Sequence, residues 1–98
     1  MRKVVLAREA LADLDALYEF IAGSGSPVAA IDYLQRLRSY YLAFADFPER
    51  GTRRDDLGPG LRMIGFEGRI TIAFHFDDNA VYIDRILYGG RDLDAAFD

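Results

Sequence analysis

Residues 61–88 read LRMIGFEGRITIAFHFDDNAVYIDRILY. This stretch contains three short segments rich in β-branched and aromatic residues, 61–66, 70–76 and 80–88, and the turn-forming residues 77–79 separate the last two. Consecutive strands joined by short turns run antiparallel. The stretch therefore predicts a three-stranded antiparallel meander.

Alternation within the segments assigns residues to the two faces of the predicted sheet, because successive side chains of a strand point to opposite sides. His75 is predicted on the more polar face, and Leu87 is predicted to share a face with Val81 and Ile83. The apolar face of the middle segment is formed by Ile70, Ile72, Phe74 and Phe76. Such a face requires a covering layer.

The preceding sequence supplies that layer. A short apolar run at residues 3–7 predicts a strand, and a helix follows it. Its apolar residues recur at intervals of three and four: Leu11, Leu14, Tyr18 and Ile21. Gly23-Ser24-Gly25 is expected to end this helix, and Ser26-Pro27 to begin another, with serine as the N-cap and proline in the first turn.

The second helix is predicted to run to about Phe47, and it carries two apolar stripes. The first consists of Ile31, Leu34, Leu37, Tyr41 and Phe44. The second, spaced by seven residues, consists of Tyr33, Tyr40 and Phe47. The second stripe either packs in the core between the first helix and the sheet, or forms a hydrophobic surface kept for a partner.

Residues 48–60 are rich in glycine, proline and charge, so we expect a loop there. The resulting order is β-α-α-β-β-β. This predicts an α+β fold in which a helical hairpin packs on one face of a small antiparallel sheet. Residues 1–98 are expected to form a single domain. The opposite sheet face and the arginine-rich loop are expected to stay open.

Composition excludes several classes of protein. The chain has no cysteine and one histidine, which argues against disulfides, thiolate metal sites and a histidine metal cluster. We therefore expect no metal and no cofactor. No apolar run is long enough to span a membrane, and no signal-peptide core is visible, so cytoplasm is the expected location. The net charge of −4 disfavours non-specific binding to nucleic acid.

Arginine is the most prominent candidate for function, since it accounts for eleven of the twelve basic residues. Its planar fork binds phosphate or carboxylate groups. The alternative is that most of these arginines form surface ion pairs that contribute little to stability. Arg91 stands out because it follows Gly89-Gly90 at a strand end. His75, as a lone histidine on a strand, is interpreted as a surface or cross-strand residue rather than a general base.

Four short motifs, in the right order, resemble those of RelE/ParE toxins. Residues 13–18, DLDALY, resemble the first-helix D-L-x-x-I signature, and residues 47–51, FPERG, resemble the P-x-x-G after the second helix. Residues 57–62, LGPGLR, resemble the L-x-P-G-L-R that opens the meander in ParE-like members. Residues 83–93, IDRILYGGRDL, are similar to the ending I-x-R-V-L-H-G-x-R-D-L, with tyrosine in place of histidine.

The resemblance implies a toxin that a co-expressed antitoxin neutralises. RelE members cut mRNA on the ribosome, whereas ParE members poison DNA gyrase. Arg62 and Arg91 fit basic positions of the nuclease branch, but Thr71 falls where an arginine is expected and Phe97 where a catalytic tyrosine is expected. Because RNA cleavage needs an acid, a base and positive charge on the phosphate, we predict no catalytic residues and the gyrase-directed branch.

The resemblance also implies partners. The expected ones are a ParD-like antitoxin of the ribbon-helix-helix class and DNA gyrase, without membrane binding and without nucleic-acid binding outside those complexes. Candidates for toxicity are Arg54, Arg62, Arg85, Tyr88 and Arg91; candidates for antitoxin binding are Tyr33, Tyr40 and Phe47. The alternatives are a RelE-type ribosome-dependent mRNA endonuclease, a non-toxic antitoxin-binding member of the fold, and an unrelated small α+β domain.

Overall fold

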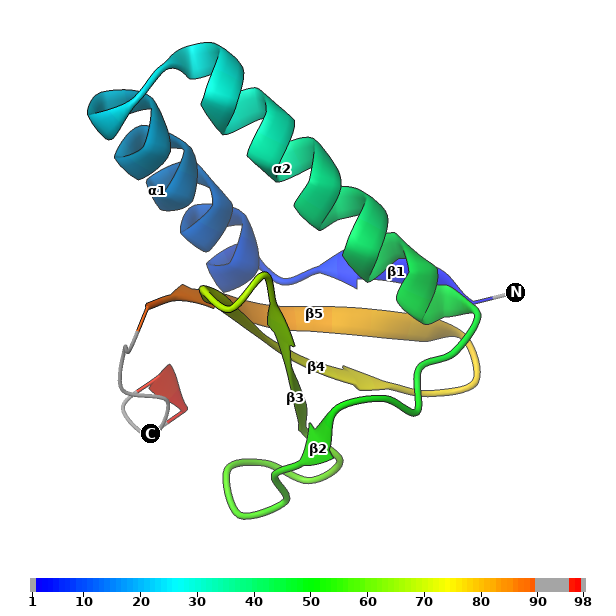
Figure 1. Cartoon of the computed structure of the whole chain (residues 1–98). Helices are drawn as coiled ribbons and strands as arrows, with labels where there is room; N and C mark the ends of the chain where they lie inside the picture. The colour runs from blue at the N-terminus through cyan, green and yellow to red at the C-terminus, as the bar shows by residue number, and fades with distance from the viewer. Residues whose placement is uncertain (1, 90–95, 98) are drawn as a thin grey trace.

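The structure is a computed structural model that describes residues 2–89, 96 and 97. It contains a helical hairpin over one face of a sheet (Figure 1). The elements are β1 (Lys3–Leu6), α1 (Arg8–Ser24), α2 (Pro27–Leu42), the 3-10 helix η1 (Ala43–Ala45), β2 (Thr52–Arg53), β3 (Arg62–Phe66), β4 (Ile70–Phe76) and β5 (Ala80–Tyr88). The predicted α+β class is confirmed.

The sheet is mixed and has the strand order β1-β5-β4-β3-β2. The predicted meander is present, since β3, β4 and β5 pair antiparallel. Two features differ from the predicted small antiparallel sheet. β1 pairs in parallel with β5, and the expected loop contains the two-residue strand β2, which pairs antiparallel with β3. A two-residue strand is too short to produce a periodic signal in the sequence.

The helical hairpin begins and turns as its sequence predicts. Ser26 precedes α2, and its Oγ accepts a hydrogen bond from the backbone N–H of Ala29, while Pro27 opens the helix. The end of α2 was predicted too late, because the α-helix stops at Leu42 and tightens into η1. No helix of the described residues is long and apolar enough to cross a membrane.

The core lies between the hairpin and the sheet. Its largest fully buried side chains include Phe44 from η1, Phe74 from β4 and Leu37 from α2. The face predicted for α1 is rotated from the one observed: Leu11 is 52% exposed, and the buried residues of the helix are Ala10, Asp13 and Leu17. Because Asp13 lies on the buried face, a prediction based only on the spacing of apolar residues did not identify that face.

A β-bulge in β5 explains a second error. Ala73 of β4 pairs with Arg85, but the next residue, Phe74, pairs with Ile83, so Asp84 is an extra residue on β5. An extra residue reverses the alternation beyond it. Ile86 therefore joins Ile83 in the core beneath the helices, in place of the predicted Leu87.

The sheet face away from the helices, called the open face below, is partly covered. Leu61, Met63 and Ala73 form a second buried cluster there, and Leu57 and Phe97 pack against it. Phe97 thus lies on the opposite side of the sheet from the helices. The prediction that this face stays open was therefore wrong at this end of the sheet.

Candidate functional site

Arg85, a candidate for toxicity, is bound by α1. Its Nε and Nη2 donate to the two carboxylate oxygens of Asp13 at 2.8 and 2.9 Å. The backbone N–H of Ile86 donates to Asp13 at 2.9 Å, just beyond the point where β1 stops pairing with β5. The Asp13 side chain is 7% exposed, and its hydrogen bonds raise the pKa of Arg85. Asp13 thus joins α1 to the edge of β5 that β1 leaves unpaired.

Arg54 and Arg62 lie apart from this pair. Arg54 donates through Nε and Nη2 to Asp56 within its own loop, both at 2.9 Å. Arg62 pairs across strands with Phe74, a core residue, and so projects to the helix side of the sheet. There its guanidinium lies 5.7 Å from the centroid of the Phe76 ring and donates to the carbonyl of Arg50.

Tyr88 also faces the helices, because it pairs with the core residue Ile70 and its ring lies 4.9 Å from that of Phe20. Arg91 falls outside the described residues. The other four toxicity candidates are therefore not brought together: one lies on a loop, two on the helix side, and Arg85 at a sheet edge.

The three residues proposed for antitoxin binding differ in burial. Tyr33 and Tyr40 pack on the core against Phe66, and the Tyr40 hydroxyl donates to the carbonyl of Gly65 at 3.2 Å. The hydroxyl of Tyr33 is buried without a hydrogen-bond partner in the described chain, and burial raises its pKa. Phe47, in contrast, is 73% exposed. The core interpretation suits the two tyrosines, and the surface interpretation suits Phe47.

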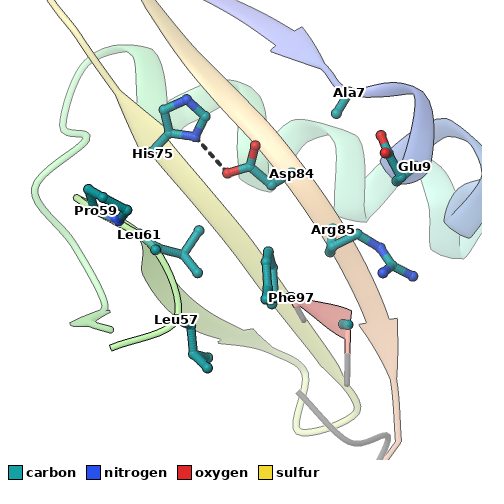
Figure 2. Close-up of a pocket in the computed structure, with 11 residues that line it drawn as sticks. Ala7, Glu9, Leu57, Pro59, Leu61, His75, Asp84, Arg85 and Phe97 are labelled. Carbon is teal, nitrogen blue, oxygen red and sulfur yellow. Dashed lines mark hydrogen bonds and ion pairs between the residues drawn. The ribbon is translucent and has the colours of Figure 1, made fainter. Parts of the chain in front are cut away.

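A hollow of about 350 Å³ opens on the open face, at the edge of β5 (Figure 2). We call it the open-face hollow. It is lined by Ala7, Glu9, Leu57, Gly58, Pro59, Leu61, His75, Asp84, Arg85, Ala96 and Phe97. The apolar side chains come from the loop before β3 and from Phe97, whereas the polar ones come from α1, β4 and the bulge of β5.

His75 and Asp84 form the polar pair of the hollow, with Nδ1 and Oδ2 2.6 Å apart (Figure 2). Because a carboxylate only accepts hydrogen bonds, Nδ1 is the donor of this pair when Asp84 is ionised. Burial raises the pKa of Asp84, the His75 hydrogen bond opposes that shift, and the charge of Glu9 adds to it. The sequence put His75 on this face, but the bulge that brings Asp84 to it has no local signature.

The open face offers little positive charge for a phosphate. Of the described strands β3, β4 and β5, only β5 supplies an arginine or lysine on this side, namely Arg85, and its guanidinium is directed away from His75 and Asp84 toward α1 (Figure 2). No three His, Asp or Glu side chains among the described residues gather as a metal site. Phe97 contributes an apolar ring and no titratable group.

Comparison with known proteins finds ParE toxins and one relative that is named RelE. Residues 4–93 match the family described as "ParE toxin of type II toxin-antitoxin system, parDE". Two curated relatives come from Caulobacter vibrioides. Toxin ParE3 is 30% identical over 97% of this chain and 94% of its own length, and Toxin RelE2 is 34% identical over 93% of this chain and 99% of its own.

A solved chain from the chromosomal ParDE TA system of P. aeruginosa has the same fold. Its TM-score is 0.78, and the match covers 91% of this chain and 97% of that one. At 24% identity, this likeness concerns the architecture alone. The mixed sheet and the helical hairpin are therefore features that the two chains share.

Proposed function

Because the chain belongs to the ParE family of toxins from type II toxin–antitoxin systems, we propose that it acts in the cytoplasm by inhibiting DNA gyrase. We further propose that a cognate ParD-like antitoxin of the ribbon-helix-helix class holds it inactive. The family match over residues 4–93 carries the toxin assignment. The residues of the open face support DNA gyrase, rather than mRNA, as the target.

Among the described residues, that face does not combine the groups that RNA cleavage needs, which supports the choice. Attack of a 2′-hydroxyl on its own phosphate requires a base, an acid and a cation at the phosphate. The described open face has Thr71 and Phe97 where an arginine and a tyrosine were sought, and Arg85 is committed to Asp13. His75 is available as a base, but it lies beside two carboxylates, which repel a phosphate.

A second candidate function is mRNA cleavage on the ribosome, and the relative named Toxin RelE2 favours it. Expression of the chain without an antitoxin separates the two. Gyrase inhibition gives filamentous cells with broken DNA and uncut transcripts. Primer extension that instead reveals codon-positioned cuts in mRNA would establish the second candidate and remove the first.

For the antitoxin we propose the outer surface of the hairpin together with an edge of the sheet. Exposed apolar side chains of α1 and α2 suit an amphipathic helix, and β1 and β2 each leave one edge unpaired within the described sheet. The exposed side chains of the hairpin are Leu11, Phe20, Val28, Ile31 and Leu42. Hydrogen exchange upon complex formation tests this, because protection is expected on the hairpin and on an edge strand.

We propose that toxicity depends most on Arg91. Gly89, two residues before it in the sequence, has a φ of +69°, which lies in the left-handed region that glycine adopts readily at the end of a strand. Arg91→Ala is expected to restore growth of cells that express the toxin alone, while its melting temperature and antitoxin affinity stay unchanged. A variant that is stable and fully toxic would remove Arg91 from the mechanism.

A further inference from the structure

We propose that the open-face hollow receives an arginine side chain of a protein partner. Its guanidinium would lie against Asp84 and Glu9, and its methylene stem against Leu57, Leu61 and Phe97. The inference rests on the proposed function in one respect: the arginine is taken to belong to a protein partner, either the antitoxin or the target. The recognition itself depends on the hollow alone.

The hollow has the two-part chemistry of an arginine side chain. One wall is apolar and belongs to the second cluster of the fold, where Leu61 is 5% exposed and Leu57 and Phe97 pack around it. The other end is polar and carries the His75–Asp84 pair and Glu9 (Figure 2). Arginine buries its methylene groups along apolar surface while its head reaches a polar partner.

The charge of the hollow favours a cation. Burial raises the pKa of Asp84 and the hydrogen bond from His75 lowers it, and the nearby charge of Glu9 raises it further, by a smaller amount. Arg85 also reaches the hollow, and after Asp13 the charge of Glu9 adds to the rise of its pKa. Its Nε and Nη2 nevertheless donate to Asp13, and no hydrogen bond joins it to Asp84 within the described chain. Two like charges that face a shared space are both stabilised by a cation between them.

Asp84 also has acceptor capacity to spare. Its side chain is only 22% exposed, and within the described chain its one side-chain hydrogen bond is that of Oδ2 with His75. An ionised carboxylate can accept about four hydrogen bonds. The bulge that presents Asp84 disrupts regular strand pairing, and bulges commonly serve to re-aim a side chain.

The same features select arginine over other ligands. A phosphate or an acidic side chain would meet the repulsion of two carboxylates. Lysine offers a compact charge with three donors, whereas the guanidinium offers five donors in a plane that bridges two carboxylates and stacks on aromatic rings such as those of His75 and Phe97.

The test is an NMR titration of the isotope-labelled full chain, made by cell-free synthesis, with Nα-acetyl-arginine amide. The neutral citrulline derivative, which has nearly the same shape, is the matched probe, and the lysine derivative tests the guanidinium. We expect amide shifts at Leu61, His75 and Asp84. Binding should weaken about tenfold for citrulline and for Asp84→Asn, as loss of one charge-assisted contact implies. The lysine derivative should bind more weakly than arginine.

Two further variants keep the test decisive. Glu9→Gln, in the exposed first turn of α1, removes a carboxylate of the hollow without touching the core, and should also weaken binding. Asp78→Asn makes the same change of charge in the exposed turn after β4, and should have no effect. Equal binding of arginine and citrulline, or equal loss in Asp78→Asn, overturns the proposal.

Two other outcomes also contradict it. Lysine binding as tightly as arginine would overturn the choice of guanidinium. Binding that emerges only in Arg91→Ala would mean that the chain's own arginine fills the hollow, not a partner's. Toxicity is scored separately in cells. A chain that binds arginine but is not toxic contradicts the proposed function and supports this inference. A chain that is toxic but does not bind arginine contradicts this inference and not the proposed function.

Discussion

Replacing Asp13 by alanine is expected to destabilise the protein severely, although the residue lies on a helix that sequence patterns treat as amphipathic. The substitution removes three hydrogen bonds at once, two from the guanidinium of Arg85 and one from the backbone N–H of Ile86. It leaves both donors without a protein acceptor at the edge of β5. Nothing else in the described structure joins α1 to that edge through a charge pair.

The size of the effect follows from burial. Removal of one partner of a buried ion pair costs about 3–5 kcal/mol, and an unsatisfied buried N–H adds a penalty of about 1–3 kcal/mol that overlaps with it. The Arg85 side chain remains 20% exposed and can recover some hydration, so the lower end applies. We expect a loss of about 3 kcal/mol, against a total stability of about 5–15 kcal/mol for domains in general.

Urea unfolding at neutral pH, followed by circular dichroism, measures this loss. Asp13→Asn keeps an oxygen for the N–H of Ile86 and should cost less than Asp13→Ala. A double-mutant cycle with Arg85→Met isolates the pair, and its coupling energy should exceed that of an exposed ion pair. A cost below about 1 kcal/mol, typical of surface pairs, or a coupling energy near zero would refute this reasoning.

Three more predictions follow from the described contacts. In Gly51→Ala, at a φ of +75°, the new Cβ would lie 2.3 Å from the carbonyl oxygen of Met63, so the free energy of unfolding should fall by about 3 kcal/mol or more. Gly60 has a similar φ but lies in open space, so Gly60→Ala should lower the free energy of unfolding by only about 1 kcal/mol. Phe47→Asp should weaken the antitoxin complex in a calorimetric titration and leave the melting temperature nearly unchanged, since the ring is 73% exposed; equal binding would exclude Phe47 from the interface. For Asp84, burial raises the pKa above the usual 3.8, so its stabilising contribution is complete at low pH and is lost as the pH rises through the folded pKa. Asp84→Asn should therefore raise the melting temperature more at about pH 7 than at about pH 4, and the opposite trend would show that Asp84 favours folding as a carboxylate.

Much of the fold was readable from local patterns. The alternation in residues 70–76 and the Ser26-Pro27 start of α2 are short-range signals, and both the strand and the start of the helix are as predicted. The parallel pairing of β1 with β5 was not readable, because it joins segments more than 70 residues apart. Only tertiary packing decides such a register.

The polar contacts of the site were less accessible to sequence reasoning. Asp13 is not part of the apolar stripe predicted for the first helix, yet it lies between Ala10 and Leu17 on the buried face, at spacings of three and four. That spacing is the one signal that could have identified it. Asp84 depends on a bulge, and a single extra residue in a strand of β-branched side chains leaves no trace in composition or periodicity.

The P-x-x-G motif gains a physical explanation. Gly51 adopts a left-handed conformation against the backbone of Met63 in β3, where any side chain would collide. The motif is thus a structural element that brings the loop back to the sheet as β2. The resemblance that it carries concerns the fold more than the target.

The central claim is that this toxin acts on DNA gyrase and does not cut RNA. The most direct measurement incubates purified toxin with gyrase, ATP and relaxed plasmid, and scores supercoiling and trapped DNA breaks on a gel. We predict breaks or lost supercoiling that increase with toxin concentration and disappear when the cognate antitoxin is added. Unchanged gyrase activity, together with mRNA cut on translating ribosomes by the same preparation, would contradict the account.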